Sequence, residues 1–428
     1  VYKRQVVPLL ATVSDMVKYE QMNLTNGMKV LLHQDPTTPL VAVNLLFRAG
    51  SKYDPPRKSG LAHLFEHLMF SGTPEAPDFD TPIQEAGGEN NAYTNSDYAN
   101  YYSYGPANNL DTLLWLEADR MHHLDISQDA LNVQQQVVIE ELYETCLNLP
   151  YGDVWHHVLP LIYRDHPYQW PVIGRDEREI ASIRLDDIRS FHKKYYHASN
   201  AILSVAGNID IDETLRQVED MFGSLNGQTQ TVETYAFNLE AYQSARLEMR
   251  SKVPVEAFYL MFPMPERNSR LFYVLDLLSD LLADGRSSVL YQRLVKEEQV
   301  LTTVDAYITG TLDTGLLIIE GRLAQGASIE YIESQIFAVL DQLADQPLST
   351  RLMQKLKNNI ESSIVFSEAS TLNKAMNLSF FELIGDSELI NSEHLIYRDI
   401  RESEIRQAIA SLLTVQSATL FHYLPAER

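Results

Sequence analysis

The segment GLAHLFEHLMFSG, residues 60–72, places two histidines four positions apart, with a glutamate directly before the second. On a helix, residues i, i+3 and i+4 lie on the same side, so His63, Glu66 and His67 would share one face. Two neutral imidazoles at this spacing can bind one Zn²⁺, and the adjacent carboxylate can deprotonate or orient a water at the metal. The order H-x-x-E-H is one of the catalytic zinc motifs. The alternative is a helix surface with two histidines and an incidental glutamate. The strongly apolar surroundings argue against it, because buried ionisable groups need partners.

A catalytic zinc site needs a third protein ligand and an open position for water. The segment QQQVVIEELYE, residues 134–144, has helical character and supplies Glu140, Glu141 and Glu144. Spacing alone does not choose among them. Glu141 and Glu144 would share a helix face, so one could bind the metal while the other orients a ligand. The alternative for this run is a charged, solvated helix face.

Hydrophobic periodicity and turn residues indicate an alternation of strands and helices around these segments. We expect strands, helices and paired strands as follows: strands at 29–35, 39–51, 200–210 and 256–265; paired strands within 85–105; helices at 59–70, 107–124, 128–147, 151–163, 184–196 and 211–222; and one long helical region at 268–299.

At 428 residues the chain is long enough for two domains. A segment rich in Gln, Asn and Thr predicts a linker at 226–246, between a domain at 16–225 and another at 247–428; residues 1–15 form an N-terminal extension. The two halves resemble repeats, since HLFEHLMFSG aligns with DLLSDLLADG, residues 276–285. That alignment predicts the same scaffold in the second half without the metal-binding residues.

The overall composition limits the classes of partner. With 58 acidic and 34 basic side chains the net charge is −24, which disfavours nucleic acid as a partner. Cys146 is the only cysteine, so the chain cannot form an internal disulfide. A lone cysteine fits a reducing compartment, and we expect a cytoplasmic location, or a periplasmic one if a signal peptide has been removed. We expect no membrane span.

The sequence also resembles the pitrilysin/insulinase family of zinc peptidases through a series of segments in the family's order. These segments are LTNGMKVLLHQD, GSKYDPPRKSGLAHLFEHLMFSGT, GGENNAYTNSDYANYY, LWLEADRM, VVIEELYE, PYGDVW, HPYQWPVIG and NAILSVAGNID. The length is similar to that of the short bacterial peptidases and the mitochondrial processing peptidase subunits. The resemblance implies an α+β fold of two homologous domains, each a mixed, mostly antiparallel sheet packed with helices. It also implies a metalloendopeptidase that acts on short or unfolded polypeptides.

The resemblance assigns a role to each site residue. His63, His67 and Glu141 would bind one zinc per chain, and Glu66 would be the general base. The family often has another glutamate two turns before the distal ligand, where this chain has Gln134; we expect Gln134 and Glu144 to support the ligands.

The resemblance also implies how substrate is held. The segment GGENNAYTNSD matches the family's edge strand, on which an extended peptide adds as a further strand, with Asn91 and Ala92 nearest the cleaved bond. Active members contribute an arginine and a tyrosine from the non-catalytic half, but Val295 and Thr302 stand at those places here. The missing pair indicates that a partner subunit supplies it or that activity is weak. We expect a homodimer, or a heterodimer with a sister subunit that supplies the pair. The competing interpretations are a non-catalytic assembly subunit and a zinc-stabilised binding module.

Overall fold

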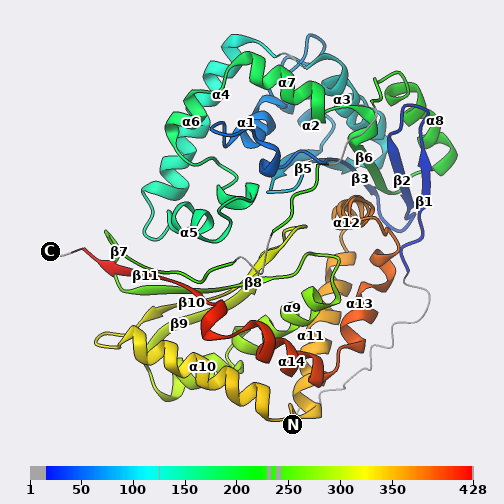
Figure 1. The fold of residues 1–428 in the computed structure, drawn as a ribbon. Helices are drawn as coiled ribbons and strands as arrows, with labels where there is room; N and C mark the ends of the chain where they lie inside the picture. Colours follow the sequence, from blue (N-terminus) through cyan, green and yellow to red (C-terminus); the bar gives the residue numbers. More distant parts are fainter. Residues whose placement is uncertain (1–15, 125, 229–232, 238–241, 427–428) are drawn as a thin grey trace.

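The computed structural model describes residues 16–124, 126–228, 233–237 and 242–426 (Figure 1). The predicted N-terminal extension, residues 1–15, lies outside the described residues, as does part of the predicted linker. None of the helices in the described ranges has the length and apolar character needed to cross a membrane.

The strands form two sheets within the described residues. The first sheet has the order β1-β2-β6-β3-β5-β4 and the second has the order β7-β11-β8-β10-β9. Their bounds are β1 Glu20–Asn23, β2 Lys29–Gln34, β3 Leu40–Phe47, β4 Glu89–Thr94, β5 Ala99–Pro106, β6 Ala201–Gly207, β7 Arg246–Ser251, β8 Ala257–Met264, β9 Leu301–Ile308, β10 Gly315–Leu323 and β11 Thr419–Pro425.

The two sheets share one topology. In the first, β2 runs parallel to β6 and the other neighbours are antiparallel. In the second, β7 runs parallel to β11 and the other neighbours are antiparallel. Strands β2 to β6 therefore correspond in order to β7 to β11, and β1 is an addition to the first sheet. The α+β fold of two homologous halves is confirmed.

Helices connect the strands and cover the sheets (Figure 1). Their bounds are α1 Leu61–Leu68, α2 Asp80–Glu85, α3 Leu110–His123, α4 Gln128–Glu141, α5 Val154–Ile162, α6 Glu177–Ala181, α7 Leu185–Tyr195, α8 Ile211–Phe222, α9 Arg270–Ala283, α10 Ile329–Asp345, α11 Thr350–Glu368, α12 Thr371–Leu383, α13 Leu389–Asp399 and α14 Glu402–Leu412. Helix α1 follows β3 as α9 follows β8, so the aligned segments at 63–72 and 276–285 occupy equivalent places.

Two of the expected helices are interrupted. The expectation of one helical region at 268–299 is wrong: α9 ends at Ala283, and a π-helical segment, Tyr291–Glu297, follows only after a turn. Gly285 in that turn has φ +68°, a left-handed conformation that suits glycine and ends the helix. The helix expected at 128–147 is α-helical only to Glu141 and continues as a π-helical turn, Leu142–Leu147.

Each half contributes a helix that packs on the sheet of the other half. Helix α12, from the second half, packs on β3 and β6 of the first sheet (Figure 1). The fit is close because small side chains meet there: Ala375 packs against Ala42 and Ala206. The hydroxyls of Ser204 and Ser379 lie 2.8 Å apart across the same contact.

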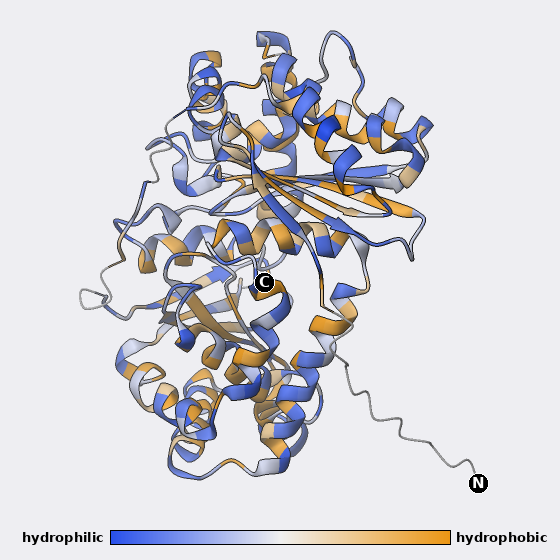
Figure 2. Cartoon of the chain, turned by 90° about the vertical axis from the view of Figure 1, so that its right-hand side faces the viewer, coloured by the Kyte–Doolittle hydropathy of each residue, from blue (hydrophilic) through white to orange (hydrophobic). Residues whose placement is uncertain are grey.

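Helix α5, from the first half, covers the second sheet in the same way. Val158 of α5 is buried in one apolar cluster with Met261, Ile318 and Phe421 of the second sheet. Apolar residues line both sheets between their covering helices, as the orange segments of Figure 2 show. Because a helix of each half packs on the sheet of the other half, the relative position of the halves is set by buried packing as well as by the connecting chain.

A buried polar cluster also joins the halves. The Lys52 Nζ atom lies 2.7 Å from Asp97 of the first half and 3.0 Å from Asp313 of the second. Asp97 also accepts hydrogen bonds from the Leu312 backbone N–H, at 2.9 Å, and from the Tyr168 hydroxyl, at 2.5 Å. Burial lowers the pKa of Lys52, but the two carboxylates outweigh it and hold that pKa above its ordinary value.

Replacing Lys52 with methionine is expected to lower the free energy of unfolding by about 3–5 kcal/mol, because Asp97 would be left buried without its cation. Urea unfolding followed by circular dichroism measures this change. Lys252→Met is the control, since Lys252 is exposed and its loss is expected to change stability by less than about 0.5 kcal/mol. Equal stabilities for the two variants would contradict a structural role for the cluster.

Candidate metal centre

The helix that carries the two histidines is fixed at both ends. Asp54 accepts hydrogen bonds from the backbone N–H groups of Gly60 and Ala62, both at 2.8 Å, and so satisfies the start of α1. Gly72 follows the helix with φ +84°, and a Cβ atom there would lie 2.3 Å from the Pro77 carbonyl oxygen. These constraints hold α1 in place beneath α4, which packs against it.

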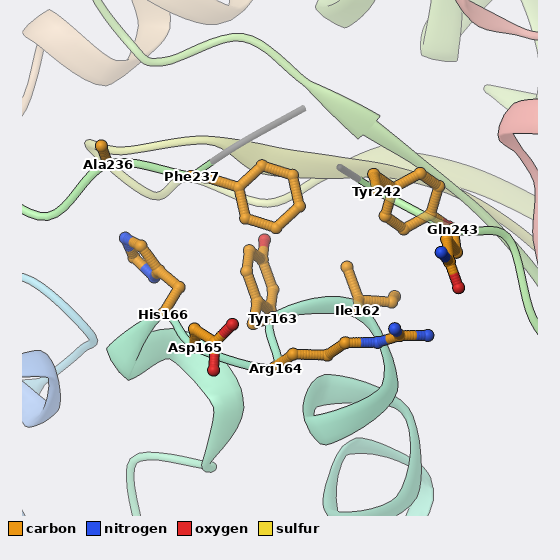
Figure 3. A pocket seen from close by; sticks show the side chains of 9 residues that line it. All are labelled: Ile162, Tyr163, Arg164, Asp165, His166, Ala236, Phe237, Tyr242 and Gln243. Carbon is orange, nitrogen blue, oxygen red and sulfur yellow. The ribbon is translucent and has the colours of Figure 1, made fainter. Parts of the chain in front are cut away.

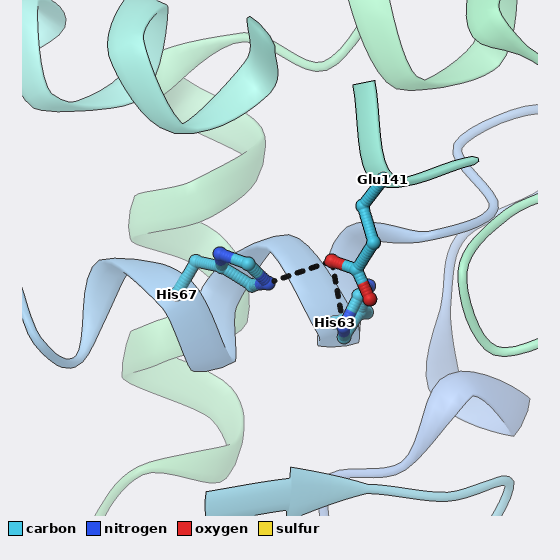
Figure 4. Close-up of side chains that lie close together, drawn as sticks. All are labelled: His63, His67 and Glu141. Carbon is cyan, nitrogen blue, oxygen red and sulfur yellow. Dashed lines mark ion pairs between the residues drawn. The ribbon is translucent and has the colours of Figure 1, made fainter. Parts of the chain in front are cut away.

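The structure brings His63, His67 and Glu141 together (Figure 4). The Nε2 atom of His67 lies 3.4 Å from the Glu141 Oε2 atom, and that of His63 lies 3.9 Å from the same oxygen. The two imidazole rings are perpendicular, with centroids 4.8 Å apart. The histidine side chains are 14% and 22% exposed and that of Glu141 is 36% exposed, so solvent reaches the cluster from the Glu141 side.

The geometry of these donors fits a zinc ion. A tetrahedral Zn²⁺ with bonds of about 2.0–2.2 Å holds its donor atoms roughly 3.3–3.6 Å apart. The three potential ligand atoms all lie within 4.8 Å of one another, so small side-chain movements would close the site. Two imidazoles and one carboxylate form one of the donor sets found in catalytic zinc sites, which keep a fourth position open.

The pKa values of His63, His67 and Glu141 are shifted by burial and by their mutual contacts. Burial lowers the pKa of His63 to about 4, which favours the neutral imidazole that a metal requires. Burial also lowers the pKa of His67, but the Glu141 carboxylate outweighs it and raises that pKa above its ordinary value. Contact with His67 in turn lowers the pKa of Glu141. The negative Glu141 carboxylate thus stabilises positive charge at His67, and it would stabilise a metal cation at this place in the same way.

Glu66 lies on the same helix but outside the cluster of three. Burial raises the pKa of its carboxyl, while Thr94 of β4 and the neighbouring His67 act in the opposite direction. Its Oε2 atom is buried and has no hydrogen-bond partner among the described residues. This carboxylate is therefore placed beside the cluster with an unused acceptor oxygen.

The other predicted site residues lie around this centre. The Gln134 side chain contacts His67, whereas Glu140 and Glu144 are exposed. Asn91 and Ala92 lie on β4, the edge strand of the first sheet.

The positions at which the family has its arginine and tyrosine lie in the second half. Val295 belongs to the π-helical segment Tyr291–Glu297 and packs against the second-half core. Thr302 is exposed on β9, and its hydroxyl donates to the Arg322 backbone carbonyl at 3.2 Å. Neither side chain carries a charge or a phenol.

Sequence reasoning missed two residues that shape the centre. Thr94 shares the α1-facing side of β4 with Ala92, a period-2 relation that was visible in the motif NNAYT. Asp54, six residues before Gly60, accepts the hydrogen bonds that cap α1. Caps are usually sought at the residue directly before a helix, so the sequence pattern did not indicate Asp54.

Comparison with known proteins agrees with this arrangement. The profile of the family described as Insulinase (Peptidase family M16) matches residues 29–175, and the profile described as Peptidase M16 inactive domain matches residues 182–360. The "Zinc protease PqqE" of Helicobacter pylori is 28% identical over 95% of this chain and 93% of its own length. A crystal structure of a protease from Helicobacter pylori superposes with a TM-score of 0.89 at 25% identity, covering 96% of this chain and 100% of that one.

A more distant relative is the probable mitochondrial-processing peptidase subunit beta of Schizosaccharomyces pombe, which is 24% identical over 83% of this chain and 79% of its own length. The two family profiles match successive parts of the chain, one over the half with the metal cluster and one mainly over the other half. The repeated sheet topology and the family's two-part sequence thus coincide, and the chain belongs to the insulinase family of peptidases, M16.

Proposed function

We propose that this protein is a zinc metalloendopeptidase that hydrolyses peptide bonds in short or unfolded polypeptides. The observation that carries the proposal is the convergence of His63, His67 and Glu141 beside the buried carboxylate of Glu66. Zinc held by the first three residues would polarise the scissile carbonyl and lower the pKa of a water molecule. Incubating the purified, zinc-loaded chain with unstructured peptides and identifying the products by mass spectrometry tests this proposal.

Glu66 is the proposed general base. Its unpartnered Oε2 oxygen takes the proton of the attacking water, so that a hydroxide equivalent adds to the carbonyl carbon. The same carboxyl then gives this proton to the leaving amine nitrogen as the C–N bond breaks. The raised pKa of Glu66 suits both steps, because the group must accept the proton and then release it.

Substrate is proposed to bind along β4. The outer edge of this strand is free of a neighbouring strand among the described residues, so an extended peptide can add to it by backbone hydrogen bonds. The Ala92 backbone N–H donates to the Asn91 side-chain oxygen at 2.8 Å, and substrate would replace that contact. Because backbone groups supply these bonds, this mode of binding accepts many sequences.

A partner subunit is proposed to stabilise the tetrahedral intermediate. Arg293 and Tyr307 lie near the positions of the missing pair but are already engaged: the Arg293 Nε atom lies 2.6 Å from Glu298, and the Tyr307 hydroxyl donates to Glu320 at 2.8 Å. The relative from Schizosaccharomyces pombe is named as a subunit, which supports an assembly of more than one chain.

The purified chain alone is accordingly expected to cleave peptides about a hundredfold more slowly than the same chain mixed with an M16 chain that carries the arginine and tyrosine. Initial rates with a quenched fluorescent peptide, measured over a range of partner concentrations, test this expectation. Efficient turnover by a monomer in size-exclusion fractions would contradict it.

The alternative is a non-catalytic or weakly active subunit of a heteromeric, processing-peptidase-like assembly. The description of the second matched profile as an inactive domain and the residues Val295 and Thr302 favour this alternative. The complete set His63, Glu66, His67 and Glu141 favours the peptidase. Substitution of Glu66 distinguishes the two, because a scaffold would lose no function with it.

A further inference from the structure

An apolar cavity lies at the seam between the two halves. Its volume is about 220 Å³, and its walls come from the first half through Ser96, Trp155, Leu159 and Trp170 and from the second half through Thr311 and Leu316. An engineered apolar cavity of about 150 Å³ is already large enough to hold benzene. The seam cavity is therefore large enough for one aromatic or long aliphatic side chain.

The cavity lies at the end of the proposed substrate strand. Thr94, the last residue of β4, contacts Glu66, and Ser96 lies two residues further along the chain. Residues 95–98 form the turn that joins β4 to β5, closed by the Asn95 N–H bond to the Tyr98 carbonyl at 3.0 Å, so the cavity adjoins the end of β4. A peptide added along β4, with its cleaved bond near Asn91 and Ala92, would extend past Thr94 and reach the cavity a few residues away from that bond.

The second-half wall is held firmly. The segment from Thr309 to Leu316 is tied to the first half by the Leu312 N–H bond to Asp97 and by the ion pair between Asp313 and Lys52. In addition, the Tyr163 hydroxyl donates to the Thr314 carbonyl at 3.0 Å. A cavity with walls fixed in this way can select a side chain by shape.

A second, smaller cavity of about 120 Å³ shares Tyr163 with the first (Figure 3). Arg164, Asp165 and His166 give it a more polar lining. Phe237 and Tyr242 border residues 238–241, which lie outside the described part of the chain, so no ligand is assigned to it.

We propose that the seam cavity is a specificity subsite that accepts one large apolar side chain of the peptide substrate, a few residues from the cleaved bond. This inference rests on the proposed peptidase function and adds to it a preference for one residue. Because successive side chains of an extended peptide point in opposite directions, the preference should be confined to a single position. The second half would thus take part in substrate selection although it lacks the metal-binding residues.

A positional scan tests the subsite. Peptides of one unstructured sequence carry phenylalanine or serine at each position near a single cleavage site, and kcat/KM is measured for each. Burial of the ring is expected to raise kcat/KM about tenfold or more at one position within a few residues of the cut. A flat profile, or a preference at every position, would overturn the proposal.

Two variants connect the preference to the cavity. Thr311→Phe fills it from the second half and is expected to abolish the preference, so that the phenylalanine and serine peptides are cleaved with equal kcat/KM. Thr303→Phe, on exposed β9 of the same hairpin, is the matched control and should keep the preference. Leu159→Ala, which removes part of the opposite wall, should weaken the preference if Thr311→Phe does not fold. Retention of the full preference by the variant that folds would overturn the assignment.

A binding measurement separates this subsite from the proposed function. In Glu66→Gln, a phenylalanine peptide is expected to cause a saturable change in tryptophan fluorescence, because Trp155 and Trp170 line the cavity whereas Trp115 packs against the first-half core. The serine peptide should cause no comparable change. If no peptide is hydrolysed by the native chain but this change is seen, the peptidase proposal fails and the subsite stands. Absence of the change overturns the subsite.

Discussion

Glu66→Gln is expected to lower kcat for peptide cleavage by roughly 10²–10⁴-fold while zinc binding is retained. The amide keeps the size and shape of the carboxylate but cannot take the proton of the attacking water. Glu66 is not one of the three clustered groups, so its loss leaves the metal donors in place. Initial rates with a quenched fluorescent peptide, together with zinc analysis of the same preparation, measure both effects.

Glu75→Gln is the matched control for this prediction. Glu75 is exposed in the loop after α1, so the variant makes the same change of charge close to the site in sequence but outside it. Its rate should equal that of the native chain. Equal rates for Glu66→Gln and Glu75→Gln would exclude Glu66 as the general base and would favour the non-catalytic subunit.

Glu141→Gln is expected to weaken zinc affinity by at least about a hundredfold and to remove most peptidase activity. Even residues that only support metal ligands typically contribute 10–100-fold to metal affinity, and a ligand should contribute more. The Oε2 atom of Glu141 is the oxygen that faces both imidazoles. Competition between the protein and a chromophoric zinc chelator gives the affinity.

Glu140→Gln provides a sharp control, because Glu140 is the adjacent residue on α4 but is exposed. Its zinc affinity should equal that of the native chain. The zinc affinity of Glu144→Gln should lie within about tenfold to a hundredfold of the native value, because Glu144 is expected only to support the ligands. A large loss of affinity in Glu140→Gln with none in Glu141→Gln would show that the geometry of the cluster has been misassigned.

The metal-binding helix could be predicted from sequence because its signal is local. His63, Glu66 and His67 lie within five residues, and the apolar pattern around them fixes which face they share. The third metal ligand was harder to predict, because Glu140, Glu141 and Glu144 are adjacent or one helical turn apart. Only the fold decides which of these carboxylates points toward α1.

The contacts between the halves could not be predicted from the sequence. Ala375 of α12 lies far in sequence from Ala42 and Ala206, which it contacts, and nothing local indicates that a helix of one half covers the sheet of the other. The cluster of Lys52, Asp97 and Asp313 likewise joins three segments that each resemble an ordinary polar turn. The seam cavity arises from these long-range contacts, so it too was invisible before the fold was known.

The break after α9 shows a different limit. Residues 268–299 are rich in helix formers, and the apolar spacing persists across Gly285. The left-handed glycine and the π-helical segment that follows separate two helices that the pattern had merged. Gly285 was the available sign of a helix end, but the continuing apolar periodicity favoured a single helix.

Anomalous X-ray scattering from crystals of the purified chain, recorded above and below the zinc absorption edge, tests the central claim most directly. We expect one zinc peak per chain, about 2.0–2.2 Å from a nitrogen of His63, a nitrogen of His67 and an oxygen of Glu141, with the Glu66 carboxylate beside the open position. The absence of any peak after soaking with zinc, or a peak that is bound by other residues, would contradict it.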